Sequence, residues 1–334
     1  SSHTMEFSEA RHRALHARYA ALGDGETASY IPELMRANPD HFALSLTTVD
    51  GRTTSVGDDT VEFSLQSISK PFVYGLALHE IGRVKLLSSV GVEPSGEAFN
   101  SIVELEKTTH RPYNPMINSG AIAITGLLSQ NSPTPLIDTI VTLLSDCAGR
   151  STENPLRIDQ SVFQSEKATA HRNRSIAHLL RHFNVIGDAI EPSLDCYFQQ
   201  CSILADTRDR SMMAATLANG GVNPITKKIV LAPQHVRDVL SVMFTCGMYD
   251  SAGEWAFHVG LPAKSGVSGG LITVVPGVMG IATYSPRIDS KGHSLRGVRA
   301  ITDLASELQL NVFTSTSSQV RELATPSHRP PSFP

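Results

Sequence analysis

The periodicity of hydrophobic and polar residues differs between the two ends and the middle of this chain. Residues 6–22 repeat Ala and Leu at helical spacing, which predicts an N-terminal helix. The stretch HFALSLTTVDGRTTSVG then alternates on both sides of Asp50-Gly51. Alternation around this dipeptide predicts a β-hairpin with a two-residue turn.

The middle of the chain is mostly helical in pattern. An alternation through Val61, Phe63 and Leu65 leads into a region, from about residue 71 to 245, with segments such as YGLALHEIG, GAIAITGLLSQ, SIAHLLRHFN and SMMAATLANGG. Several of these segments end at Gly or Asn, as helix C-termini often do. Strand patterns return in GGLITVVPG and GVMGIATYSPRI, and a last helical pattern, GVRAITDLASELQL, follows them.

This order predicts an α/β fold of the α+β kind. One antiparallel sheet, made from N- and C-terminal strands and flanked by helices, buries both sets of strands if an all-helical subdomain is inserted between them. We expect residues 6–70 and 246–315 to form the α/β subdomain and residues 71–245 the helical one. Residues 1–5 are interpreted as a tag remnant, and the Pro-rich tail, 316–334, is expected to be disordered.

Composition narrows the choice of partner. The chain has 334 residues, of which 41% are hydrophobic and 18% charged, and its net charge is -4. This balance gives no electrostatic reason to expect nucleic acid or an acidic membrane as a partner. No apolar run approaches the roughly 20 residues that cross a bilayer, and SSHTMEF lacks the features of a secretory signal. We therefore expect a small-molecule substrate.

Cysteine usage indicates a reducing compartment. The four cysteines are too scattered for a disulfide framework, and their spacing does not suggest a zinc site. The four cysteines are Cys147, Cys196, Cys201 and Cys246. We expect a cytoplasmic protein without a metal or cofactor.

The segment QSISKPF lies where the alternating pattern gives way to the helical one, and it contains Ser67, Lys70 and Pro71. Residues three apart share one face of a helix, so the serine hydroxyl and the lysine amine can form a hydrogen bond. An amine with a lowered pKa can activate a serine as nucleophile. The start of a helix favours negative charge on Ser67 and tolerates proline in its first turn. No other serine of the chain has lysine three residues later.

A second candidate element is LPAKSGVSGG, residues 261–270. Lys264-Ser265-Gly266 before a glycine-rich strand entry is similar to the Lys-Thr-Gly element that accompanies Ser-x-x-Lys in penicillin-recognising enzymes. The N–H of Val267, together with that of Ser67, would form a two-donor oxyanion hole. The alternative is a loop that only precedes a strand.

Two further segments leave a structural and a functional interpretation open. Asn114 and Asn118 precede an apolar helix in NPMINSGAI, where asparagine either caps the helix or presents an amide to a substrate. Tyr249 in TCGMYDSAGEWA is either a packed side chain or, beside a lysine, a proton relay.

Taken in order, these segments resemble the serine-dependent glutaminases, a family that shares the fold of serine β-lactamases and penicillin-binding proteins. The resemblance runs from about Tyr30 to about Gly297. It rests on SYIPEL, QSISKPF, EPSGEAFNSI, YNPMINSGAI, SEKATAHRNR, YFQQCSI, TCGMYD, LPAKSGVSGG, and YSPRID with LRG.

The resemblance implies a role for each matched position. Ser67 would be the nucleophile, Lys70 its activating partner and Tyr249 the proton relay, with Lys264 as possible electrostatic support. The remaining substrate-binding positions would be Tyr30, Asn118, Glu166, Asn173, Tyr197 and Val267.

The chemistry of a glutamine zwitterion agrees with these implied roles. Glu166 can accept from its ammonium group, and Asn173 and tyrosine hydroxyls can donate to its carboxylate. Glu166 and Asn173 lie about two helical turns apart and would face one pocket if SEKATAHRNR is helical.

The resemblance implies hydrolysis of L-glutamine to L-glutamate and ammonia through a Ser67 acyl-enzyme, in a homodimer or homotetramer. One alternative is a β-lactamase or D-Ala-D-Ala peptidase, and another is a non-catalytic amino-acid sensor. The pattern departs from the family at Ser119 and Ser268, where Ala or Gly is common, and at His293, where Asn is common. The general base, the preference between glutamine and asparagine, and any effector stay open.

Overall fold

The computed structural model describes residues 9–106, 109–130 and 132–314. The predicted tag remnant and tail lie outside these residues. The strands are β1 (Ala43–Thr48), β2 (Thr53–Gly57), β3 (Phe63–Ser64), β4 (Leu204–Ala205), β5 (Ala263–Ser265), β6 (Gly270–Val275) and β7 (Met279–Tyr284). The helices are α1 (Glu9–Ala20), α2 (Pro32–Met35), α3 (Lys70–Ile81), α4 (Arg83–Ser89), α5 (Asn118–Gln130), α6 (Leu136–Cys147), α7 (Gln160–Thr169), α8 (His171–His182), α9 (Ile190–Cys201), α10 (Thr207–Ala218), α11 (Pro233–Cys246), α12 (Ala252–His258) and α13 (Leu295–Glu307), with 3-10 turns at Gln66–Ser69, Val103–Glu106 and Tyr249–Ser251.

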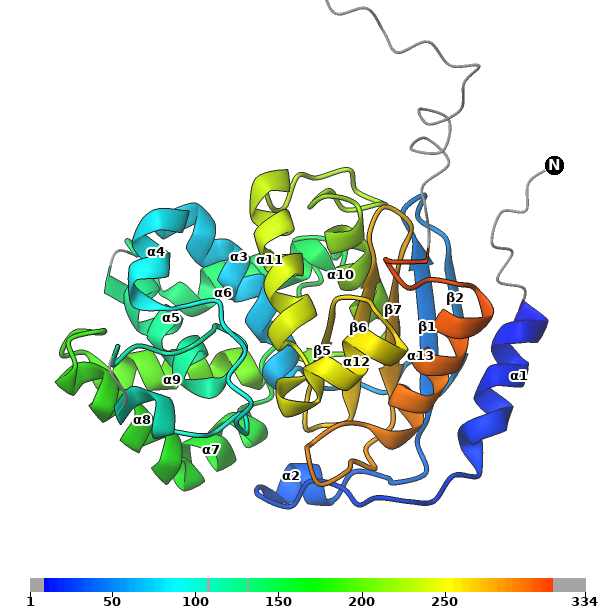
Figure 1. The fold of residues 1–334 in the computed structure, drawn as a ribbon, viewed down its shortest axis with the longest axis horizontal. Coiled ribbons are helices and arrows are strands. Elements are labelled where there is room, and N and C mark those ends of the chain that lie inside the picture. The colour runs from blue at the N-terminus through cyan, green and yellow to red at the C-terminus, as the bar shows by residue number, and fades with distance from the viewer. Residues whose placement is uncertain (1–8, 107–108, 131, 315–334) are drawn as a thin grey trace, which may run out of the picture.

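Strands from both ends of the chain form one five-stranded sheet in the order β2-β1-β7-β6-β5 (Figure 1). Every pairing is antiparallel, and the N-terminal β1 lies beside the C-terminal β7. The predicted antiparallel sheet of N- and C-terminal strands is therefore confirmed.

The hairpin β1–β2 forms at Asp50-Gly51, but its turn is longer than the two residues predicted. The Thr48 N–H donates to the Arg52 carbonyl at 2.9 Å, which leaves three residues in the loop. Gly51 has φ 92°, a left-handed value that glycine adopts without steric cost. A three-residue loop with glycine in this conformation is the next most common hairpin connection.

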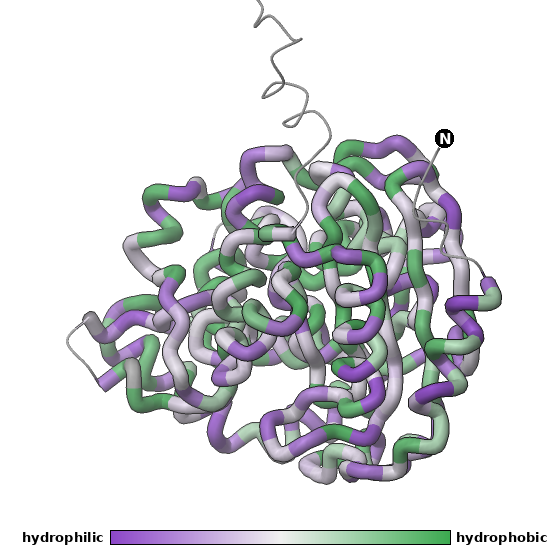
Figure 2. The backbone as a smooth tube through the Cα atoms, turned by 45° about the vertical axis from the view of Figure 1, so that its right-hand side comes forward, coloured by the Kyte–Doolittle hydropathy of each residue, from purple (hydrophilic) through white to green (hydrophobic). Residues whose placement is uncertain are grey.

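Both faces of the sheet are buried. On β6 and β7, Leu271 and Ile281 belong to one hydrophobic cluster, while their neighbours Ile272 and Ala282 belong to another. Successive side chains of a strand point to opposite faces, so the sheet separates two cores. Figure 2 shows many hydrophobic stretches inside the molecule and hydrophilic ones at many outer turns.

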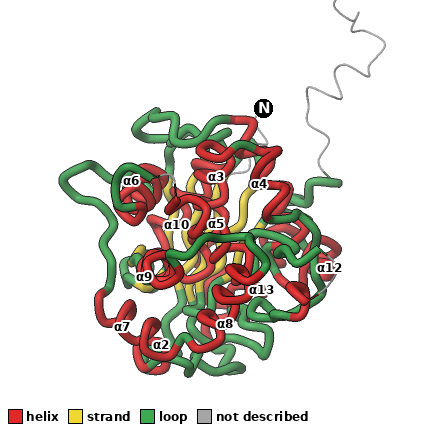
Figure 3. Tube along the Cα trace, turned by 90° about the vertical axis from the view of Figure 1, so that its left-hand side faces the viewer, coloured by secondary structure: helices red, strands yellow, loops and turns green. Residues whose placement is uncertain are grey.

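Helices cover each face. α1, α12 and α13 contribute to one core, whereas α10 packs directly on β1, β6 and β7 from the other side. Helices α3 to α9 form a layer beside the sheet, and Figure 3 shows helices in front of the strands when the molecule is viewed from this layer. Helix α10 falls within the range 71–245 yet contacts the sheet, so it links the two parts.

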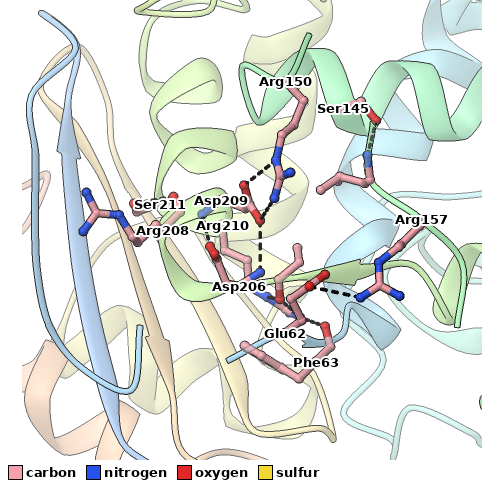
Figure 4. Close-up of polar contacts among 12 residues, drawn as sticks. Glu62, Phe63, Ser145, Arg150, Arg157, Asp206, Arg208, Asp209, Arg210 and Ser211 are labelled. Carbon is pink, nitrogen blue, oxygen red and sulfur yellow. Dashed lines mark hydrogen bonds and ion pairs between the residues drawn. The ribbon is translucent and has the colours of Figure 1, made fainter. Parts of the chain in front are cut away.

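Polar contacts fix α10 where the helical layer meets the sheet (Figure 4). The Asp206 side chain caps the helix, and Arg150 donates to both carboxylate oxygens of Asp209 at 3.0 and 2.8 Å. The fully buried Arg210 donates to the carbonyls of Phe63 and Ala205, which belong to the paired strands β3 and β4. This junction therefore supports the strand that leads to Ser67.

Candidate active site

Ser67 lies at the end of the short path from β3 to α3. It belongs to the 3-10 turn Gln66–Ser69, so the prediction that it begins an α-helix is wrong in detail, since the α-helix starts at Lys70. The 3-10 spacing still places residues i and i+3 together. The Lys70 Nζ donates to the Ser67 Oγ at 2.9 Å, and both residues are buried.

Lys70 is surrounded by neutral oxygen acceptors. Its Nζ also donates to the Asn118 Oδ1 at 2.7 Å, and only 2% of the residue is exposed. Burial lowers its pKa to about 8 because the charged form loses hydration. An amine in this state can release its proton near neutral pH, as a base for serine requires.

A second buried lysine lies beside Tyr249. The Lys264 Nζ donates to the Tyr249 Oη at 2.9 Å and to the Ser265 carbonyl at 2.8 Å. Burial, with the charge of Lys70 nearby, lowers the pKa of Lys264 well below its ordinary value. Burial raises the pKa of Tyr249, and the neighbouring Ser67 side chain offsets part of that rise. Ser67, Tyr249 and the two lysines therefore form one continuous polar group.

The other predicted substrate-binding residues line a cavity of about 370 Å³ above Ser67. Asn118 Nδ2 donates to Asn173 Oδ1 at 3.1 Å, and Tyr197 Oη donates to Asn118 Oδ1 at 3.2 Å. Tyr30 Oη lies 3.1 Å from Glu166 Oε1. The cavity is of the size that proteins use for small molecules.

Glu166 and Asn173 face the same cavity from two helices. The predicted continuous helix breaks at Ala170, between α7 and α8, because that residue has ψ 45°. Glu166 is 7% exposed, and burial raises its pKa to about 7, although Gln66 and Tyr30 donate to it. A cation bound next to this buried carboxyl group would stabilise its ionised form.

Val267 borders the cavity on the side of the strand β5. Within the described part of the chain, no protein acceptor takes the Val267 N–H. The adjacent Ser268 Oγ donates to the Ser64 carbonyl at 2.7 Å, which ties this loop to the approach to Ser67. The Val267 N–H is thus available to a bound molecule.

The structure places the two asparagines in different surroundings. The Asn114 Oδ1 accepts from the Met116 N–H at 2.9 Å, so this residue shapes the turn before α5. Asn118 instead contacts Lys70 and borders the cavity.

Several cavity residues were not predicted from the sequence. Gln66 is buried next to Ser67, has φ 49°, and its Oε1 lies 3.1 Å from the Tyr30 Oη. Its position beside the serine was the only local signal. The remaining unpredicted residues of the lining come from distant segments: Phe99, Asn100, Thr169, Ala170, Arg172 and Cys201.

Neither a membrane span nor a metal cluster appears in the part of the chain that the structure describes. Its helices are too short or too polar to cross a bilayer. Its His, Cys, Asp and Glu side chains do not gather in groups of three or more suited to a metal ion.

The five-stranded antiparallel sheet, the adjoining helical layer and the buried Ser67–Lys70 pair define a protein of the β-lactamase-like fold class. Among solved structures, the chain resembles Mglu in its tris and glutamate form, with a TM-score of 0.87 and 42% identity over 92% of this chain and 68% of that one. It also resembles the probable glutaminase YbaS, with a TM-score of 0.87 and 37% identity over 92% and 98% of the two chains.

The family model named Glutaminase matches residues 25–313. Among curated proteins, the glutaminase of Nostoc sp. is 50% identical over 90% of this chain and 88% of its own length. The glutaminase of Microcystis aeruginosa is 50% identical over 93% and 90% of the two chains. The chain belongs to the glutaminase family, and it is an enzyme that hydrolyses glutamine.

Proposed function

We propose that this chain hydrolyses the side-chain amide of L-glutamine through an acyl-enzyme on Ser67. The contact between Ser67 Oγ and Lys70 Nζ, at 2.9 Å inside a buried site, is the observation that carries this proposal. Lys70, whose pKa is lowered to about 8, supplies a base next to Ser67.

In the first half of the reaction, the Ser67 oxygen forms a bond with the amide carbon and gives its proton to Lys70. The N–H groups of Val267 and Ser67 stabilise the negative oxygen of the tetrahedral intermediate. The C–N bond then breaks, the leaving nitrogen takes a proton relayed through Tyr249, and ammonia departs. Water attacks the ester in the second half, which releases L-glutamate and restores the serine hydroxyl.

The cavity residues provide recognition of the amino-acid end. Glu166 accepts from the substrate ammonium group, while Asn173 and tyrosine hydroxyls donate to its carboxylate. Tyr30 and Tyr197, which both line the cavity, supply these hydroxyls. Lys264 acts on the reacting atoms only through Tyr249, as electrostatic support.

A direct test measures ammonia release from glutamine and asparagine, and opening of the β-lactam ring of a penicillin, by wild type and Ser67→Ala. Removing a serine nucleophile lowers kcat by roughly five to six orders of magnitude in comparable hydrolases. We expect a loss of at least this order with glutamine, while the variant still binds glutamate. Near-normal turnover by Ser67→Ala would overturn the assignment, and hydrolysis of the penicillin in preference to glutamine would favour the β-lactamase alternative.

We further propose that the protein acts in the cytoplasm as a homodimer or homotetramer. The four cysteines are free and buried, which supports a reducing compartment. Exposed apolar side chains on and beside α4, such as Val84 and Leu87, provide surface for self-association. Light scattering of the purified protein tests the oligomeric state.

A further inference from the structure

The loop between β7 and α13, residues 285–294, contacts Tyr249 and Ser265 through His293, which does not line the cavity. His293 in this loop is 2% exposed, and its ring stacks on that of Tyr249 with a centroid separation of 5.9 Å and an interplanar angle of 15°. The His293 Nδ1 forms a 2.9 Å hydrogen bond with the Ser265 Oγ. Ser265 in turn accepts from the Lys264 Nζ through its carbonyl. His293 therefore contacts Tyr249 directly and reaches Lys264 through Ser265.

Tyr249 needs support because its backbone is strained. Its φ of 54° is in the left-handed region, which costs a non-glycine residue about 1–3 kcal/mol and persists only where surrounding contacts hold it. The contacts of its side chain include the Lys264 hydrogen bond, the Ser67 side chain, the Phe99 ring at 5.4 Å and the His293 ring. Phe99 comes from a loop that borders the open cavity, whereas His293 is enclosed.

The His293 loop is itself fixed by polar contacts. The Asp289 Oδ1 accepts from the N–H of both Lys291 and His293, at 2.9 and 3.0 Å. Lys291 lies 3.9 Å from the Asp250 carboxylate, next to Tyr249 in sequence. Burial and the nearby Lys264 lower the pKa of His293, while Asp289 and Asp250 act in the opposite direction. These contacts hold the ring in place, and its burial favours the neutral form.

We propose that His293 is a positioning residue for the glutaminase reaction, which holds Tyr249 and Lys264 in line with Ser67 through its ring contact and its hydrogen bond to Ser265. This inference rests on the proposed function, in which Tyr249 relays the proton to the leaving nitrogen. His293 does not line the substrate cavity, so it acts on the rate of the chemical step and leaves substrate binding unchanged.

The test compares three substitutions that remove different contacts. His293→Leu loses both, His293→Asn keeps a polar group for Ser265, and His293→Phe keeps a ring for Tyr249. A misplacement of a catalytic group by about 1 Å lowers a rate by roughly 100-fold. We expect kcat to fall about 10- to 100-fold in His293→Leu and less in the other two variants, with the inhibition constant of L-glutamate unchanged within about twofold.

His12→Leu is the matched control, because His12 is also a buried histidine, at 1% exposure, but packs where α1 meets the sheet. It should lower the melting temperature without lowering kcat. A His293→Leu variant that is folded and has wild-type kcat would overturn the inference. So would a loss of kcat matched by an equal loss of glutamate binding, since that indicates general distortion of the site.

If His293→Leu does not fold, His293→Asn and His293→Phe decide the question, and wild-type kcat in both would overturn the inference. Ser67→Ala separates this inference from the proposed function. An inactive Ser67→Ala with fully active His293 variants contradicts the role of His293 alone. An active Ser67→Ala contradicts the mechanism itself.

Discussion

Lys70 carries a cationic side chain, and no carboxylate contacts its Nζ among the residues that the structure describes. Its two described acceptors, Ser67 Oγ and Asn118 Oδ1, are neutral oxygens. Burial lowers its pKa to about 8, below the ordinary value of 10.5, so the neutral amine gains population as the pH rises through 8. The fraction of enzyme able to accept the serine proton should increase over the same range.

A substitution that keeps the charge but cannot lose the proton tests this role. Lys70→Arg should lower kcat/KM about 10³-fold or more, because arginine stays protonated and cannot act as the base. Lys228→Arg makes the same change at a lysine whose side chain is 56% exposed and should leave activity unchanged. A Lys70→Arg variant within tenfold of wild type, measured as ammonia release between pH 7 and 9, would contradict the assignment.

The proposed pairing of Glu166 with the substrate ammonium group predicts that substrate binding depends on pH. Its pKa is raised to about 7 by burial, so below pH 7 the carboxyl group is mostly neutral and cannot pair with a substrate ammonium group. We expect KM for glutamine to rise as the pH falls from 8 to 6. Glu166→Gln should have a high KM that does not change over this range, while Glu254→Gln, on an exposed part of α12, should retain the wild-type profile.

The same pKa shift predicts the pH dependence of stability. The pKa of the Glu166 carboxyl group is 4.5 in the unfolded chain and about 7 in the folded protein. Its protonated form therefore stabilises the folded protein fully below pH 4.5, and this contribution to the free energy of unfolding is lost as the pH rises through about 7. The size is about 3 kcal/mol for a shift of this magnitude. In urea unfolding, Glu166→Gln should therefore be more stable than wild type at pH 8. Equal midpoints at pH 8 would show that Glu166 is not destabilised by burial.

At the residue scale, predictability from the sequence depended on how far the interacting groups lie apart. The spacing of Ser67 and Lys70 fixes their contact in an α-helix or a 3-10 turn alike. The hydrogen bond between Lys70 and Asn118 joins residues 48 positions apart, and no local pattern encodes it. The contact between Tyr249 and Lys264 was not predicted, because it joins a 3-10 turn to the strand β5 and no local pattern encodes it.

At the scale of elements, α10 and β7 approach so closely that their contact depends on a glycine. A Cβ atom added at Gly280 would lie 2.2 Å from the Ala215 backbone nitrogen and 2.5 Å from the Ser211 carbonyl oxygen. Both atoms belong to the α10 backbone and cannot move separately from the helix. The helix also carries Arg210, which holds the strand before Ser67.

Gly280→Ala should consequently destabilise the protein by about 2–3 kcal/mol, as overpacking of a tight core does. It should also lower glutaminase activity, because displaced α10 shifts β3. Gly253→Ala is the matched control, since this glycine lies in α12 with nothing within 4 Å of the added Cβ. That control should be neutral or slightly stabilising. Equal urea midpoints for the two variants would contradict the close contact.

Element boundaries departed from the sequence pattern where a single residue interrupted a regular element. The periodicity of SEKATAHRNR continues through Ala170, yet the backbone there divides α7 from α8. Helix α12 spans only Ala252–His258, too few residues for a helical period to stand out, and was not predicted. The hairpin was foreseen from alternation around Asp50-Gly51, and the strands β6 and β7 from their content of Val, Ile and Thr between Gly and Pro.

At the scale of the whole molecule, the sheet joins segments that are distant in the chain. β1 lies between β2 and β7 and pairs with β7 through Ala43↔Tyr284. Composition and alternation indicated which residues form strands, but the order of the strands follows from long-range packing of α10 and α13 against opposite faces. Because the central strands contribute to both cores, each core needs the other to be complete.

This shared sheet predicts that the two cores unfold together. Trp255 is the only tryptophan of the chain, is 5% exposed and belongs to the core with α1, α12 and α13. Far-UV circular dichroism reports mainly the helices, most of which surround the other core. Tryptophan fluorescence and circular dichroism should therefore give the same urea midpoint, as a single cooperative transition requires.

Leu271→Ala and Ile272→Ala change neighbours on β6 that face opposite cores. In each variant, the fluorescence midpoint and the circular dichroism midpoint should fall by the same amount. A fluorescence transition that moves alone in Leu271→Ala would mean that the two layers unfold independently despite the strands they share.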